Sequence, residues 1–253
     1  MKKTALISLM FVLTLAYANA SGIMGNGKPI TIEKTLTQFD SIRAGGKCAV
    51  NFHESEEYRA VITIDSNLEE YIDVSVRDST LGIGIKTGFR INHTKYIVDV
   101  FCPLVKNISL SGSVQFSCID KIRTTDIALY ISGSAKINGS FECESFNAGI
   151  SGSSNISGNI ESNSFSADIS GSSNIVLTGN AEDMNISVSG SVKFDGKDFQ
   201  TKNTSIRVSG SSIISVWATN HLKAQVSGST TVKYRGNPVI DITGSGSKRL
   251  QSI

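Results

Sequence analysis

Residues Ala148-Gly149-Ile150-Ser151-Gly152-Ser153-Ser154-Asn155-Ile156 return nineteen residues later, almost unchanged, as Ala167-Asp168-Ile169-Ser170-Gly171-Ser172-Ser173-Asn174-Ile175. The central Ser-Gly-Ser element, or a close variant, recurs at intervals of 16 to 21 residues. Its glycines are Gly112, Gly133, Gly152, Gly171, Gly190, Gly210, Gly228 and Gly244. A recurrence this short indicates stacked units of a few strands, because one unit cannot bury its own apolar side chains.

The residues around each glycine alternate between apolar and polar. Positions two and four before the glycine are apolar, as Ile169 and Ala167 are before Gly171, and the position between them is polar in most elements, as Asp168 is. A period of two is typical of strands and excludes an amphipathic helix. We therefore predict an all-β fold, a single-stranded parallel β-helix or solenoid with coils of about 19 residues, right-handed by the usual preference of parallel crossovers.

The Ser-Gly-Ser element itself predicts a corner and an exposed ladder. At each of the eight glycines a side chain would compete for space, and a residue without Cβ accepts a positive φ, so all eight are predicted to form corners of the coils. The flanking serines should face outward. One serine column is therefore a candidate binding ladder, namely Ser132, Ser151, Ser170, Ser189, Ser209 and Ser227.

The first twenty residues are typical of a signal peptide. Lys2 and Lys3 precede an uncharged apolar stretch, and Ala18-Asn19-Ala20 is a small-x-small cleavage site. We expect residues 1–20 to be removed and residues 21–253 to form one β-helix domain without a transmembrane segment. Within it, residues 106–253 carry the Ser-Gly-Ser coils and residues 30–105 are expected to be irregular first coils or a cap, with Asn67-Leu68-Glu69-Glu70-Tyr71 as a short helical turn.

Charge excludes some partners. The full chain has two more basic than acidic residues, and this excess equals Lys2 and Lys3, so the chain from Ser21 onward has equal numbers of basic and acidic residues. A balanced surface gives no electrostatic reason to bind nucleic acid. It also offers little repulsion between copies, which favours a homo-oligomer.

Other segments carry a resemblance to a known family. They are Phe39-Asp40-Ser41-Ile42-Arg43-Ala44-Gly45-Gly46, Leu81-Gly82-Ile83 and Tyr234-Arg235-Gly236-Asn237-Pro238. Together with the returning Ser-Gly-Ser elements, they resemble the putative auto-transporter adhesin, head-GIN domain family. The resemblance implies a β-helix-like fold in secreted or envelope proteins, common in Bacteroidota, without established catalytic residues.

The residues suited to chemistry are scattered. We predict no catalytic, cofactor-binding or metal-binding residues, because the three histidines are far apart, and Asp168 and Asp241, the two acids in the slot three before the glycine, lie four coils apart. The cysteines Cys48, Cys102, Cys118 and Cys143 match no zinc template, and they could form disulfides in an oxidising compartment or pack as small buried side chains. Trp217 falls on a slot predicted to face the core.

These observations favour an exported, non-catalytic adhesin or binding module in the periplasm, on the cell surface or outside the cell. Its partner would be a glycan or a surface protein bound along the coils. One alternative is a structural envelope protein that assembles with itself. Another is a carbohydrate-active hydrolase or lyase.

Overall fold

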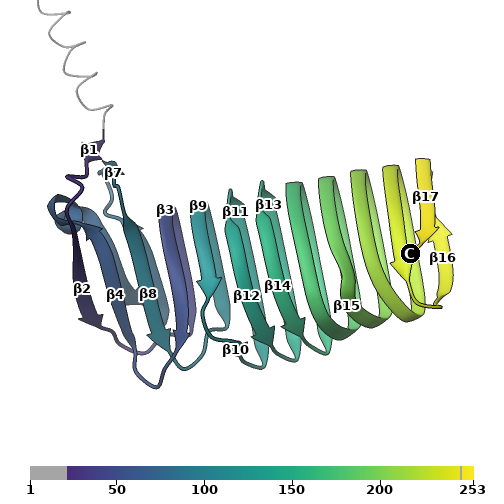
Figure 1. The fold of residues 1–253 in the computed structure, drawn as a ribbon, viewed down its shortest axis with the longest axis horizontal. Helices are drawn as coiled ribbons and strands as arrows, with labels where there is room; N and C mark the ends of the chain where they lie inside the picture. Colours follow the sequence, from purple (N-terminus) through teal and green to yellow (C-terminus); the bar gives the residue numbers. More distant parts are fainter. Residues whose placement is uncertain (1–21, 246) are drawn as a thin grey trace, which may run out of the picture.

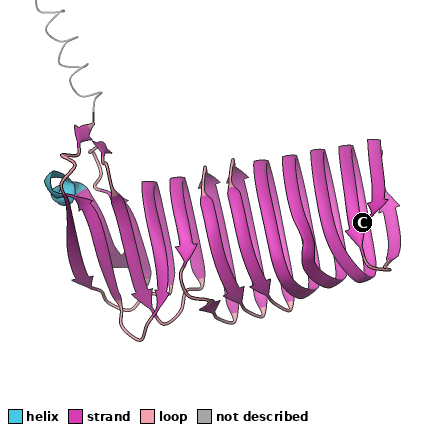
Figure 2. Ribbon diagram, in the orientation of Figure 1, coloured by secondary structure: helices cyan, strands magenta, loops and turns pink. Residues whose placement is uncertain are grey.

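The computed structural model describes residues 22–245 and 247–253, so the predicted signal peptide lies outside the described residues. The described chain is almost entirely β-strand, with one short 3-10 helix, η1. Its strands stand side by side along the long axis, from the N-terminal end to the C-terminal end (Figures 1 and 2). The all-β prediction is confirmed.

The elements follow one another in the order of the sequence. They are β1 (Ile23–Met24), β2 (Pro29–Thr35), β3 (Ser41–Glu54), β4 (Arg59–Asp65), η1 (Ser66–Tyr71), β5 (Ile72–Arg77), β6 (Thr80–Ile85), β7 (Ile91–Asn92), β8 (Tyr96–Cys102), β9 (Asn107–Cys118), β10 (Ile122–Arg123), β11 (Asp126–Gly133), β12 (Lys136–Glu142), β13 (Ser145–Gly152), β14 (Asn155–Glu161), β15 (Ser164–Arg235), β16 (Val239–Thr243) and β17 (Ser247–Ser252).

The Ser-Gly-Ser elements lie directly beside one another. Parallel pairing aligns Gly133 with Gly112 and with Gly152, and it aligns Gly152 with Gly171. The strands after the glycine pair in the same way, with β12 between β9 and β14. Each element is thus one row of the sheet, with one strand segment that leads into the glycine and a second that leaves it.

The two segments of each row enclose one core. Leu129 and Phe146 from the segments before the glycine, and Ile137 and Phe141 from those after it, line the same internal cavity of about 20 Å³. The apolar slots two and four before the glycines are buried from Ile108 onward in every row but the last, which confirms their predicted direction. The core is therefore a continuous column of interdigitating aliphatic and aromatic side chains.

The prediction of a single-stranded parallel β-helix is wrong. Fifteen strands form one large mixed sheet, and its N-terminal part is antiparallel: β2 pairs with β4, β4 with β8, and β5 with β6. From residue 112 onward the Ser-Gly-Ser elements pair in parallel, but this arrangement does not extend through residues 30–105. There the chain reverses direction several times between Gly46 and Gly112, which are neighbours in the sheet.

A tight turn explains one of these reversals. Asp78 and Ser79 join β5 to β6 with φ angles of +48° and +56°. Positive φ at both central residues gives the turn whose twist matches an antiparallel hairpin. Neither residue is glycine, so the turn has no strong sequence signal. The predicted helical turn at residues 67–71 is confirmed as η1, which follows β4.

A buried carboxylate fastens the N-terminal end. Asp65 is fully buried, and its Oδ1 accepts hydrogen bonds from the Gly27 amide at 3.0 Å and the Thr94 hydroxyl at 2.6 Å. Its Oδ2 accepts a bond from the Thr94 amide at 2.6 Å. These bonds, above all that from the Thr94 hydroxyl, hold the pKa of Asp65 below its ordinary value. Asp65 therefore ties the turns before β2 and β8 to the end of β4.

The glycines form a column in which a side chain has no room. A Cβ on Gly133 would lie 2.6 Å from the carbonyl oxygen of Gly112, and the glycines of the later rows are stacked more closely still. Their φ angles are positive, from +82° at Gly112 to +142° at Gly210. The column begins one row earlier than the sequence indicated, at Gly46. Gly244 lies against Val226 rather than Gly228, so it stands outside the column.

Substitutions at Val208 and Ser209, two neighbours on one strand, test which side chains point into the core and which point outward. Val208 is 4% exposed and Ser209 is exposed. We expect Val208→Asp to lower the free energy of unfolding by at least about 3 kcal/mol, because it buries an unpaired carboxylate. Ser209→Asp should change it by less than about 0.5 kcal/mol. Urea unfolding monitored by circular dichroism measures both, and equal losses would contradict the register.

Candidate binding face

The six ladder serines lie on the outer surface of the segments that lead into the glycines. Each is exposed, and each follows a buried apolar residue. Ser132 pairs with Ser151, and Ser151 pairs with Ser170, so their side chains form one line that runs across the strands. Adjacent strands place such side chains about 4.8 Å apart.

The hydroxyl groups of this ladder have no partner within the described residues. In the preceding row, by contrast, the Ser111 hydroxyl lies 3.5 Å from the Ala44 carbonyl oxygen. A serine hydroxyl donates one hydrogen bond and accepts two. The ladder therefore presents a line of donors and acceptors to the solvent.

A second column runs beside the ladder, three residues before each glycine. It is more varied, and consists of Ser109, Tyr130, Gly149, Asp168, Ser187, Arg207 and Gln225. Together, the ladder and this column are named the serine face. Two shallow grooves lie along it, one of about 410 Å³ at Tyr130 and one of about 430 Å³ between Asp168 and Gln225.

Tyr130 supplies an aromatic ring to the first groove. Its side chain is 55% exposed and lies over Gly149 in the next row, where a Cβ would be 3.1 Å from the ring. Arg43 lines the same groove. The sequence reasoning did not select Tyr130, although an aromatic residue at an outward position of the alternation was a signal for it.

The second groove carries two charges that no neighbour neutralises. Asp168 and Arg207 stand two rows apart, with Ser187 in the row between them. Neither side chain forms a hydrogen bond or an ion pair with any residue that the structure describes. Two uncompensated opposite charges in one groove suit a polar ligand better than an apolar one.

A different set of hydroxyl groups points inward. Two residues after the glycine, the buried side chains are Ser154, Ser173, Ser212 and Thr230. The Val192 amide donates a hydrogen bond to the Ser212 Oγ at 3.1 Å, and Ser154 receives one from the Ala135 amide. Ser154 and Ser212 therefore satisfy buried backbone amides. The Ser173 and Thr230 hydroxyl groups are buried without a partner among the described residues. The sequence reasoning did not separate them from the exposed serines.

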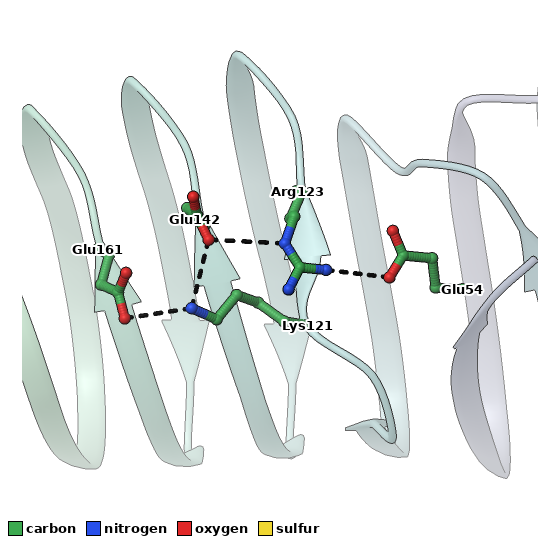
Figure 3. A network of polar contacts seen from close by, with 5 residues as sticks. All are labelled: Glu54, Lys121, Arg123, Glu142 and Glu161. Atoms are coloured by element: carbon green, nitrogen blue, oxygen red, sulfur yellow. Dashed lines mark hydrogen bonds and ion pairs between the residues drawn. The ribbon is translucent and has the colours of Figure 1, made fainter.

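At a different place on the sheet, ion pairs link charged side chains of neighbouring rows (Figure 3). Lys121 Nζ lies 3.3 Å from Glu142 Oε2 and 3.2 Å from Glu161 Oε1, and Arg123 lies 3.0 Å from Glu54 Oε2. The hydrogen bond with Glu161 is the largest cause of the raised pKa of Lys121. Each of these carboxylates is paired with Lys121 or Arg123, so the residues form a surface ion-pair network.

The histidine with an acidic partner also has a packing role. His53 Nε2 lies 3.3 Å from Asp99 Oδ1, and its ring stacks on Phe101 at 4.5 Å between centroids. Arg59, from the strand on the other side of Phe101, covers the ring at 3.6 Å. The three side chains form a cross-strand stack.

The four cysteines are unpaired thiols. Burial raises the pKa of Cys48 to about 11 and that of Cys102 to about 12. Burial likewise raises the pKa of Cys118 to about 12 and that of Cys143 to about 11. Thiols that stay protonated at neutral pH are poor nucleophiles and poor metal ligands.

Trp217 does not point into the core as predicted. It is only partly buried, and the Arg235 guanidinium lies 4.1 Å from its ring centroid, while Val216 and Ala218 on either side are fully buried. The interval between Gly210 and Gly228 is one residue shorter than the typical nineteen. That shift of one residue turns the side chain to the opposite face.

Within residues 22–245 and 247–253, no three His, Cys, Asp or Glu side chains are grouped so that they could hold a metal ion. In the same part of the chain, no helix has the length and hydropathy needed to cross a membrane.

Residues 38–238 match the family described as "Putative auto-transporter adhesin, head GIN domain". A comparison with curated proteins finds no match.

Several solved structures are similar. A structure described as a putative adhesin from Parabacteroides distasonis ATCC 8503 has 23% identity and a TM-score of 0.87, over 92% of this chain and 100% of that chain. One described as a putative lipid binding protein from the same organism has 26% identity and a TM-score of 0.85, over 91% and 99%. A putative adhesin from Parabacteroides merdae ATCC 43184 has 24% identity and a TM-score of 0.81, over 92% and 100%. The two adhesin structures show a shared fold.

The inward serines can be tested against their outward neighbours. We expect Ser212→Ala to lower the free energy of unfolding by about 1–2 kcal/mol, because it leaves the buried Val192 amide without an acceptor. Ser211→Ala, at the exposed neighbouring position, should change it by less than about 0.5 kcal/mol. Thermal and urea unfolding of both variants provide the comparison. A neutral Ser212→Ala would show that the inward hydroxyl has no structural role.

Proposed function

Because the chain belongs to the family described as "Putative auto-transporter adhesin, head GIN domain", we propose that it is an exported, non-catalytic binding module that binds glycan chains through the serine face. The module would act at the cell surface, in the periplasm or outside the cell. The observation that carries this proposal is the ladder of exposed serine hydroxyl groups, which have no partner within the described residues.

A glycan suits the ladder for chemical reasons. Sugar hydroxyl groups both donate and accept hydrogen bonds, as serine hydroxyl groups do. The ladder repeats at the strand spacing of about 4.8 Å, so a chain lying along the stack would meet a similar group at each row. Many weak contacts of one kind favour an extended polymer over a small molecule.

The second column of the serine face would supply specificity. The exposed ring of Tyr130 offers an apolar surface on which the C–H groups of a sugar ring can pack. Asp168 and Arg207 offer a charged acceptor and charged donors at a fixed separation, and hydrogen bonds to charged groups are the stronger ones. These three residues are therefore the places where one glycan would be distinguished from another.

A lipid ligand fits the described interior less well. One similar structure is described as a putative lipid binding protein. Pockets that enclose a small-molecule ligand usually have a volume of about 300–1,000 Å³. Here the internal cavity is about 20 Å³, and the two grooves of the serine face are shallow and lie on the surface.

We propose no hydrolytic step on the bound chain. Hydrolysis of a glycosidic bond ordinarily needs two carboxyl groups on either side of that bond. Asp168 is the one carboxylate among the described residues that line the two grooves of the serine face. The acids of the Lys121 network lie elsewhere and are paired.

Screening the purified protein on a glycan array tests the proposal. Titration of the best ligand then gives the affinity of each variant. We expect Tyr130→Ala to weaken binding about tenfold, which is the loss of one aromatic contact. Replacing both Asp168 by Asn and Arg207 by Gln should weaken it further or change the preferred glycan. The melting temperature of each variant should match that of the unchanged protein.

Phe89→Ala is the matched control, because Phe89 is 47% exposed and lies near the N-terminal end of the sheet. It should leave glycan affinity unchanged. The proposal fails if no glycan binds, or if Phe89→Ala weakens binding as much as Tyr130→Ala.

A further inference from the structure

The C-terminal end of the sheet leaves core positions uncovered. Ile240 continues the column of Leu222, and Leu250 continues the column of Val232. Leu222 and Val232 are 1% and 2% exposed, but Ile240 and Leu250 are 36% and 41% exposed. Val239 and Ile253 add further apolar surface, at 67% and 51% exposed. These side chains are exposed because the row they belong to is the last one described.

The backbone at this end is also open. Within the described residues, β16 and β17 each pair only with β15, so the outer edge of each strand has no partner. An edge strand that also exposes apolar side chains is a template for pairing with another chain. Figure 1 shows both strands at the end of the stack.

The opposite end is closed differently. Leu68 of η1 is fully buried against the core, and Asp65 fastens the turns around it. Charged residues follow Leu68 there, namely Glu69 and Glu70. Uncovered core positions in the last row are thus a feature of the C-terminal end, and a partner for it should present an apolar end of its own.

We propose that a second copy of this chain covers this end, tail to tail, about a two-fold axis. In this arrangement β16 of one copy lies antiparallel to β17 of the other, and Ile240 and Leu250 of both copies are buried together. A two-fold interface uses the same surface on both partners and closes after two copies. The assembly is therefore a discrete dimer in which both C-terminal ends are covered.

The charges of the two terminal strands favour a second copy over an unrelated partner. β16 carries Asp241 and β17 carries Arg249, both exposed, and neither forms an ion pair within the described residues. When β16 lies beside β17 of the second copy, each Asp241 comes near the second copy's Arg249. The end is thus complementary to itself in charge as well as in apolar surface.

The mass of the purified protein in solution tests this proposal, by light scattering and sedimentation over a range of concentrations. We expect a dimer, and we expect Leu250→Lys to raise its dissociation constant by at least about tenfold, because it places a charge in the apolar interface. Ile119→Lys is the matched control, since Ile119 is 59% exposed and follows β9, several rows from this end. It should leave the dimer unchanged.

Charge reversal separates the interface from local unfolding of the last strands. Asp241→Arg and Arg249→Asp should each weaken the dimer, and the double variant should restore it. A monomer at concentrations up to about 100 μM would overturn the proposal. So would a dimer that survives Leu250→Lys, an assembly larger than two copies, or a double variant no better than the single ones. None of these results depends on glycan binding by the serine face.

Discussion

The close approach of successive rows at the glycine column is the constraint on which the rest of the structure depends. At Gly112 a Cβ would lie 2.7 Å from the carbonyl oxygen of Gly46, and φ is +82°. A residue with a side chain would have to displace the backbone of the row before it and adopt an unfavourable conformation. Because the glycines align from Gly46 to Gly228, the apolar slots before and after them face one core.

The position relative to the aligned glycine determines the role of each serine. The residue before the glycine is outward, and its hydroxyl remains available on the serine face. The residue two after the glycine is inward, and at Ser212 its hydroxyl bonds to the backbone of the row below. Serine thus serves both solubility and internal hydrogen bonding. A ligand that follows the stack would contact only the first kind.

The alternation around Gly171 was sufficient to predict strands, their inward residues and the exposed serines, because each of these follows from side-chain direction along a strand. It could not predict the path of residues 30–105, where the turn at Asp78 and Ser79 and the contacts of Asp65 reverse the chain without a local signal. The direction of the Trp217 side chain was predicted wrongly because a change of one residue in the spacing between glycines moves a side chain to the opposite face of the strand. For the candidate site, the ladder was visible in the sequence, whereas the grooves at Tyr130 and Arg207 depend on which rows become neighbours.

The most direct measurement of the central constraint is the free energy of unfolding of Gly171→Ala compared with Gly84→Ala. A Cβ at Gly171 would overlap the backbone of Gly152, whereas one at Gly84 would have nothing within 4 Å. We predict a loss of about 2 kcal/mol or more for Gly171→Ala, and no loss or a small gain for Gly84→Ala. Equal effects of the two substitutions, or a neutral Gly171→Ala, would contradict the account.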